Sequence, residues 1–315
     1  MSLLEVCVLT PFTEQQKRRL ETAGGSACRF HYDPDAELLK KADIMIGNPD
    51  PAILKEAEKL QWLQLTSAGA DPYVKPGVLA ENTKLTNASG AYGVSVSDHM
   101  MVMTYAPLRN FNYYSRRQKE HLWQPGGAVR SIEECTVLVM GLGDIGSRYA
   151  RQMKALGAKV LAIRRTLREL PDYVDEQYTL ADLAKIIGEA DIIANVLPGG
   201  PATEHIINRE IIACMKPDAI LINAGRGSAI DPAALKEALR EGRIGGAGLD
   251  VTEPEPLPAD DELWDYENVI ITPHVAGQFY LASTLERITA IAAENLVHFM
   301  AGEPLNHVVN KVHGY

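Results

Sequence analysis

The sequence predicts an α/β protein made of two domains, each built around a parallel sheet. Three observations lead to this fold class: a length of 315 residues, a regular alternation of short apolar runs with helix-length stretches, and a glycine-rich turn at 141–146. A typical domain holds about 150 residues, so the length predicts about two domains. Short strands that alternate with helices are typical of βαβ units, whose strands run parallel.

The alternation predicts the elements in order. The first half predicts a strand at 6–9, a helix at 13–23, a strand at 44–46, a helix at 52–60 and a strand at 62–65. The second half predicts a strand at 136–140, a helix that ends at 156, and strands at 159–163, 191–195, 219–223, 247–250 and 269–272. The pattern is clearer in the second half, which therefore predicts the fuller, doubly wound sheet.

Two longer helices complete the prediction. Residues 97–118 are Met-rich and contain little Gly or Pro, so we expect one long helix there that joins the domains. Its apolar face is also suited to contact a partner subunit. Residues 281–300 contain no Gly or Pro and follow the last predicted strand. We expect this helix to carry the chain back to the first domain.

Composition and charge exclude several classes of protein. A hydrophobic fraction of 46% and a charged fraction of 23% are typical of a soluble globular protein. The net charge of −10, with no basic stripe to offset it, disfavours binding to nucleic acid. The cysteines form no C-x-x-C pair, so we expect reduced thiols in a cytoplasmic protein. We expect no membrane span or export signal, because no run of about 18 apolar residues occurs.

The glycine-rich turn predicts a dinucleotide-binding site. It follows an apolar strand directly and opens a helix, which is the context that a G-x-G-x-x-G fingerprint requires. Gly141 permits the tight turn, Gly143 lets the backbone approach a pyrophosphate, and Gly146 allows close helix–strand packing. Asp144 and Ile145 lie at the helix N-terminus, where N–H groups and the helix dipole attract phosphate. A turn without a ligand is the alternative.

The end of the next strand predicts which dinucleotide is bound. An acid about 20 positions after the glycines would hold the ribose hydroxyls of NAD. The sequence has Arg164, Arg165 and Thr166 there, and no acid precedes Glu169. Guanidinium groups pair with the extra 2′-phosphate of NADP. We therefore expect NADP, with NAD as the alternative if both arginines are simply solvated.

Three segments in the last third of the chain carry a further pattern. They are NAGRGS at 223–228, LDVTEPEPLP at 249–258 and ITPHVAG at 271–277. Together with the glycine-rich turn, they resemble the D-isomer-specific 2-hydroxyacid dehydrogenase family. Residues 64–71 and 97–99 resemble the substrate loop and interdomain helix of that family, so the resemblance spans nearly the whole chain.

Arg226 and His274 have the chemistry that reduction of a 2-keto acid requires. A guanidinium anchors the carboxylate through two hydrogen bonds and polarises the carbonyl, and Arg226 stands between two glycines at a strand end. Histidine can donate the proton that the carbonyl oxygen gains, and His274 directly follows a predicted strand and Pro273. A structural ion pair for Arg226 and a surface position for His274 are the alternatives.

The resemblance implies the remaining site residues. Glu255, rather than Glu253, pairs with His274 and favours its protonated form, with a charged turn as the alternative. Asp250 orients the nicotinamide carboxamide. The other implied contacts are Leu197, Pro198, Thr203, Ala224, Ala276 and Gly277 for the cofactor, and the backbone N–H groups of Ser67, Ala68 and Gly69 for the substrate carboxylate. No metal ion is implied, and we expect Asp98, His99 and His205 to be structural.

The resemblance also implies an arrangement of domains. A doubly wound (Rossmann) cofactor domain, residues 99–285, is inserted into a smaller flavodoxin-like α/β substrate domain made of residues 1–98 and 286–315. The active site is expected in the cleft between them. A homodimer is implied as well, with residues 100–123 in its interface.

We therefore expect a cytoplasmic oxidoreductase that transfers a hydride between NADPH and a small 2-keto acid to give the D-2-hydroxy acid. Glyoxylate and hydroxypyruvate are the first candidate substrates. One alternative is an NAD-dependent dehydrogenase of phosphoglycerate type or of larger hydroxy acids, which the Arg164–Arg165 pair disfavours. An alternative of another class is a nucleotide-sensing corepressor, which the intact set of Arg226, Glu255 and His274 disfavours.

Overall fold

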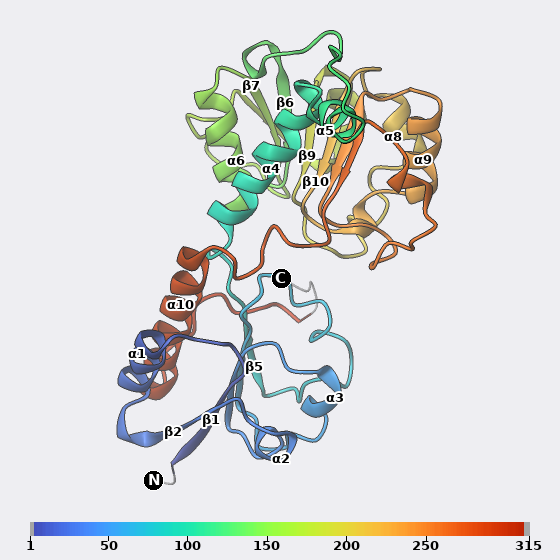
Figure 1. The fold of residues 1–315 in the computed structure, drawn as a ribbon. Helices are drawn as coiled ribbons and strands as arrows, with labels where there is room; N and C mark the ends of the chain where they lie inside the picture. Colours follow the sequence, from blue (N-terminus) through green and yellow to red (C-terminus); the bar gives the residue numbers. More distant parts are fainter. Residues whose placement is uncertain (1–2, 312–315) are drawn as a thin grey trace. The chain divides into compact units, whose positions relative to one another are not determined.

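The computed structural model describes residues 3–311, and the chain divides into two compact units (Figure 1). The smaller unit combines the residues up to Tyr92 with those from Phe279 onward, and the larger unit runs from Gly93 to Gln278. Both units are α/β structures with parallel sheets, and the larger interrupts the smaller in sequence. The predicted fold class is confirmed.

The smaller unit holds a five-stranded parallel sheet in the order β2-β1-β3-β4-β5. Its strands are β1 (Leu4–Val8), β2 (Cys28–Tyr32), β3 (Ile44–Ile46), β4 (Trp62–Gln64) and β5 (Lys84–Thr86). Its α-helices are α1 (Glu14–Gly24), α2 (Ala36–Leu39), α3 (Pro51–Leu54) and α10 (Ala282–Ala301). Helices α1 and α10 pack against each other and lie side by side in Figure 1.

The predicted helix at 52–60 is wrong after Leu54, where α3 ends. After it, the N–H groups of Ala57 and Leu60 donate to carbonyls three residues earlier, in successive turns. Leu54, Ala57 and Leu60 are all buried in the core of the smaller unit. The three-residue spacing of these turns brings the three apolar side chains inward without a regular helix.

The larger unit holds a seven-stranded parallel sheet in the order β12-β11-β10-β9-β6-β7-β8. Its strands are β6 (Thr136–Met140), β7 (Lys159–Ile163), β8 (Glu176–Tyr178), β9 (Ile192–Asn195), β10 (Ile220–Asn223), β11 (Gly246–Leu249) and β12 (Val269–Ile271). Its α-helices are α4 (Gly93–Leu108), α5 (Phe111–Lys119), α6 (Asp144–Ala155), α7 (Leu183–Ile186), α8 (Arg209–Ala213) and α9 (Pro232–Arg240). The strand order reverses between β6 and β9, and ligands of such sheets bind beyond the carboxyl ends of strands at this reversal.

The single helix predicted at 97–118 is wrong, because the structure has two helices, α4 and α5, with a break at Arg109–Asn110. Pro107 lies in the last turn of α4 and removes a backbone donor there. Asn110 then adopts the left-handed conformation with a φ of 58°, which ends the helical run. The Asn110 side chain donates to the carbonyls of Gly126 and Ala128, which stabilises the break.

The boundaries between the units fall a few residues before the predicted positions, 98/99 and 285/286. Helix α4 packs against α6, β10 and β11 from Gly93 onward in the chain, so its first residues belong with the larger unit. Helix α10 packs against α1, so the residues that lead into it belong with the smaller unit. The predicted segment 286–315 also contains residues 312–315, which lie outside the described residues.

Three further predictions from the sequence are that the protein has no membrane span, no metal site and reduced cysteines. Between residues 3 and 311, no helix is both long enough and apolar enough to cross a lipid bilayer. Over the same range, no group of three or more His, Cys, Asp or Glu side chains is arranged to hold a metal ion. The thiols of Cys7, Cys28, Cys135 and Cys214 are free.

Candidate active site

The glycine-rich turn joins β6 to α6 at the point where the strand order reverses. Gly141 has a φ of 100°, a conformation that favours glycine. A Cβ on Gly146 would lie 1.9 Å from the Gly141 carbonyl oxygen, so only glycine lets α6 start this close to the strand. A Cβ on Gly143 would meet no atom within 4 Å, which leaves the backbone open to a ligand.

The N-terminus of α6 fits a pyrophosphate. Its N-cap is Gly143, and no side chain caps the helix there, so its first N–H groups are left for a ligand to satisfy. Asp144 and Ile145 are the first two residues of this helix. The turn after β9 contains Leu197 and Pro198, and Thr203 donates to the Pro198 carbonyl over 2.7 Å. These loops follow β6 and β9, the two strands that flank the reversal.

The residues predicted to select the dinucleotide come directly after β7. Arg164 is half-buried and continues the ladder with a backbone bond of 3.0 Å to Tyr178, while Arg165 and Thr166 are exposed. This is the strand end at which the ribose of a bound dinucleotide lies in doubly wound sheets. The selection of NADP by these side chains stays a prediction.

Arg226 lies in the tight turn after β10, and its two glycine neighbours are required by the packing. A Cβ on Gly225 would lie 2.7 Å from the Leu197 carbonyl oxygen, and one on Gly227 would lie 1.9 Å from that of Thr252. Asn223 donates to the Arg226 carbonyl over 2.9 Å, and the Arg226 guanidinium donates to the Gly225 carbonyl over 2.9 Å. The side chain is half-buried and held by the turn.

The structure brings His274 and Glu255 together. The Nδ1 atom of His274 lies 3.1 and 3.2 Å from the two carboxylate oxygens of Glu255. A carboxylate only accepts, so Nδ1 carries the hydrogen, and Nε2 is directed away from this pair. The His274 side chain is 49% exposed and the Glu255 side chain 43%, which leaves room for a ligand.

The other acid of the same loop has a different partner. Glu253 accepts from Nε2 of His205 over 2.8 Å, and this bond raises the pKa of the His205 imidazole above its ordinary value. Of the two acids in this loop, Glu255 contacts His274 and Glu253 contacts His205. The catalytic role of Glu255 stays a prediction.

Asp250 follows β11 and holds the turn that carries His274. Its carboxylate is buried and accepts from the Thr272 hydroxyl over 2.6 Å and from the N–H groups of Val275 and Ala276 over 2.9 and 3.2 Å. The His274 N–H donates to the Asp250 carbonyl over 2.8 Å, and His274 has a φ of 52°. Asp250 thus fixes an otherwise unfavourable turn. Sequence reasoning missed Thr272, although it stands inside the quoted motif at 271–277.

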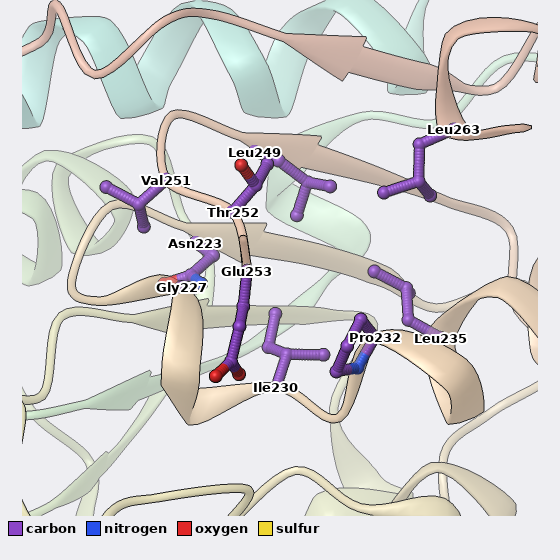
Figure 2. A pocket seen from close by; sticks show the side chains of 10 residues that line it. All are labelled: Asn223, Gly227, Ile230, Pro232, Leu235, Leu249, Val251, Thr252, Glu253 and Leu263. Carbon is purple, nitrogen blue, oxygen red and sulfur yellow. The ribbon is translucent and has the colours of Figure 1, made fainter. Parts of the chain in front are cut away.

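A small pocket lies beside these turns in the larger unit (Figure 2). It is lined by Asn223, Gly227, Ile230, Pro232, Leu235, Leu249, Val251, Thr252, Glu253 and Leu263. Most of these side chains are apolar, and the set does not include Arg226, Glu255 or His274. The predicted catalytic residues therefore do not line this pocket.

The predicted residues of the larger unit all follow the carboxyl ends of its parallel strands. Ala224 and Arg226 come after β10, Asp250 after β11, and Ala276 and Gly277 after β12. Ser67, Ala68 and Gly69 belong to the smaller unit, where they follow β4. Their contact with a substrate stays a prediction.

A family model described as the NAD binding domain of D-isomer specific 2-hydroxyacid dehydrogenases matches residues 100–276. The chain belongs to this family. As a member, it is an NAD(P)-dependent D-2-hydroxyacid dehydrogenase, and the predicted family is confirmed.

Relatives of this dehydrogenase differ in the substrates that their names state. Glyoxylate/hydroxypyruvate reductase B of Serratia proteamaculans is 32% identical over 291 residues, which cover 89% of this chain and 88% of the relative. D-3-phosphoglycerate dehydrogenase of Methanocaldococcus jannaschii is also 32% identical, over 98% of this chain but 60% of the relative. The NADPH-dependent glyoxylate/hydroxypyruvate reductase of Sinorhizobium meliloti, solved with NADP and sulfate, has a TM-score of 0.83 and 28% identity and covers 99% of this chain and 100% of that one.

Proposed function

We propose that this dehydrogenase reduces a small 2-keto acid, glyoxylate or hydroxypyruvate, to the D-2-hydroxy acid with NADPH. The observation that carries the proposal is the His274–Glu255 pair at 3.1 Å, in the larger unit that also holds Arg226 and the glycine-rich turn. A positioned acid, its carboxylate partner and a carboxylate-binding cation are what this reduction needs. The two relatives named for glyoxylate and hydroxypyruvate reduction support the choice of substrate.

Arg226, His274 and Glu255 each have a different role in the proposed reaction. When bound, the dinucleotide supplies the hydride that the keto carbon gains. Arg226 binds the substrate carboxylate and polarises the carbonyl, since a guanidinium offers two parallel donors. His274 gives its Nε2 proton to the carbonyl oxygen as that oxygen gains an electron pair. Glu255 holds Nδ1–H, which fixes the ring orientation and leaves Nε2 directed away from the pair.

We propose that the N–H groups of Ala68 and Gly69, with that of Ser67, bind the substrate carboxylate. The Ser67 carbonyl accepts from the Ala88 N–H over 2.9 Å, and the Ala68 carbonyl accepts from the Asn87 side chain over 2.8 Å. In a trans peptide the N–H points opposite to the carbonyl, so these bonds turn the N–H groups of Ala68 and Gly69 outward from the loop. Outward N–H groups suit an anionic ligand.

The preference for NADP rests on the cationic strand end after β7. We predict that Arg164→Asp raises the KM for NADPH by about 10²-fold and leaves the KM for NADH within a few-fold, because a charge-assisted bond to the 2′-phosphate is replaced by repulsion. Steady-state kinetics with each dinucleotide measure this. Arg168→Asp, the same charge change on an exposed residue four positions later, is the control. Equal effects of Arg164→Asp on both dinucleotides would remove Arg164 from cofactor selection.

The second candidate function is NAD-dependent oxidation of a phosphoglycerate-type hydroxy acid, favoured by similarity to the phosphoglycerate dehydrogenase relative. Parallel assays of wild-type enzyme with NADPH and NADH separate the two. The panel is glyoxylate, hydroxypyruvate, pyruvate, phenylpyruvate, a branched-chain keto acid and 3-phosphohydroxypyruvate. We expect the fastest loss of nicotinamide absorbance with NADPH and glyoxylate or hydroxypyruvate. Preference for NADH and the phosphorylated acid would establish the second candidate instead.

We also propose a homodimer, with a second copy covering the apolar surface of α4, α5 and the segment after them. The exposed large apolar side chains there are Val102, Tyr105, Phe111, Tyr114, Leu122, Trp123 and Val129. A cluster of this kind is typical of a subunit interface. We predict a dimer in sedimentation velocity and a monomer for the double variant Phe111→Ser, Trp123→Ser. Leu170→Ser, which changes an exposed leucine elsewhere, is the control, and a monomeric wild type would contradict the proposal.

A further inference from the structure

We propose that His99 is a positioning residue that holds the turn carrying His274, and that it acts through Thr272 and Asp250. The proposal rests on the proposed function, because the turn matters to catalysis only if His274 is the proton donor. From the sequence, His99 is expected to be structural. His99, Thr272, Asp250 and His274 all lie in the larger unit.

Two side chains on one face of α4 contact the two ends of the turn. Ser95 and His99 are four residues apart, so they are neighbours on the helix surface. The Ser95 hydroxyl donates to the Ala276 carbonyl over 2.7 Å, and Nε2 of His99 lies 2.9 Å from the Thr272 hydroxyl oxygen. Helix α4 thus contacts the turn on either side of His274.

The hydrogen bonds among His99, Thr272 and Asp250 allow only one assignment of donors and acceptors. Asp250 is buried and its carboxylate accepts, so the hydroxyl of Thr272 must donate its single hydrogen to Asp250 over 2.6 Å. The oxygen of Thr272 is then an acceptor for His99, and Nε2 of His99 must carry the hydrogen. The resulting chain is His99 to Thr272 to Asp250, with His99 also 3.7 Å from the nearer carboxylate oxygen.

This chain fixes the carboxylate that organises the turn. The Asp250 oxygen that accepts from Thr272 also accepts from the Val275 N–H over 2.9 Å, and the other oxygen accepts from the Ala276 N–H over 3.2 Å. These two N–H groups directly follow His274 in the chain. A rotation of the carboxylate would weaken both bonds and release His274 from its φ of 52°.

Helix α4 packs closely against the sheet, and this packing fixes the position of His99 beside the turn. Met103, one further turn along the same face, packs over Gly248 in β11. A Cβ on Gly248 would lie 2.9 Å from the Met103 Cβ, so the helix is as close to the strand as glycine allows. Asp250 comes two residues after Gly248, at the end of that strand. The distance from His99 to the turn is therefore set by backbone packing.

The test compares His99→Leu, which removes the donor, with His99→Gln, whose amide places an N–H near the position of Nε2. We expect His99→Leu to lower kcat about tenfold while the KM for the keto acid changes less than about twofold, because a misplaced acid slows transfer more than binding. His99→Gln is expected to restore most of the rate. Asp98→Asn, on the preceding residue of α4, removes a charge but keeps an oxygen that can accept from Gln152; it is the control, with the wild-type rate expected.

Thr272→Val supplies a double-mutant cycle. If His99 acts through Thr272, His99→Leu has no further effect on kcat in the Thr272→Val background. A tenfold loss in both backgrounds would overturn the proposal. So would a His99→Leu enzyme with unaltered kcat.

Amide hydrogen exchange at Val275 and Ala276 gives a readout that needs no turnover. We expect exchange about fivefold faster in His99→Leu and Thr272→Val, and near wild type in His99→Gln. Unchanged exchange in His99→Leu would overturn the proposal. Faster exchange in an enzyme without keto-acid reductase activity would instead refute the proposed function and leave the contact between His99 and the turn established.

Discussion

Replacing His274 with Asn is expected to lower kcat by about 10²–10⁴-fold, because the variant loses the acid that protonates the carbonyl oxygen. Asparagine tolerates positive φ, so it can adopt the φ of 52° that His274 has, and the turn need not rearrange. Dinucleotide binding, measured by fluorescence titration, should stay near wild type. Steady-state kinetics with the best keto acid of the panel measure the loss of rate.

His205→Asn is the matched control for this prediction. His205 also has a positive φ, 45°, and also pairs with a glutamate, Glu253, at 2.8 Å. The control therefore removes the same kind of pair from a histidine outside the proposed catalytic set and should keep the wild-type rate. A wild-type rate for His274→Asn would exclude His274 as the proton donor, and equal losses in both variants would indicate a structural effect.

Replacing Arg226 with Lys is expected to lower kcat/KM for the keto acid by about 10²–10³-fold. Lysine keeps the positive charge but loses the planar pair of donors that binds a carboxylate bidentately. The turn holds the guanidinium 2.9 Å from the Gly225 carbonyl. A lysine ammonium cannot contact this carbonyl and also bind the substrate carboxylate through two parallel donors. Kinetics with the keto acid, together with thermal unfolding to show an intact fold, check the result.

Arg240→Lys is the control for Arg226→Lys. Arg240 binds both carboxylate oxygens of Glu262, at 2.7 and 2.9 Å, on an exposed surface. Exposed ion pairs contribute little, so this variant should keep wild-type kinetics. If Arg226→Lys also kept them, the substrate carboxylate would be bound elsewhere.

The sequence was sufficient to predict those parts of the fold in which the local backbone conformation or packing requires a particular residue. The glycine-rich turn was predictable because the tight turn at Gly141 and the close packing at Gly146 each exclude a side chain. Strand β2, with the sequence CRFHY at the edge of its sheet, was not predictable, because polar residues interrupt its apolar pattern. The break between α4 and α5 was missed because the sequence shows only one proline, Pro107, before it.

The candidate site, too, could be predicted from the sequence only in part. Residue type and resemblance were enough to propose Arg226, Glu255 and His274, whose catalytic roles stay predictions. The contact of His99 with Thr272 joins residues 173 positions apart, and no periodicity predicts such a pair. Only the packing of α4 against β11 brings the two side chains together.

The most direct test of the proposed reaction is to follow the hydride itself. Wild-type enzyme would be mixed with hydroxypyruvate or glyoxylate and NADPH deuterated at both C4 positions, and the product analysed by mass spectrometry and, for hydroxypyruvate, on a chiral column. We expect a 2-hydroxy acid that carries one deuterium at C2 and, from hydroxypyruvate, has the D configuration. Product without deuterium, L or racemic product, or no product despite tight binding of NADPH would contradict it.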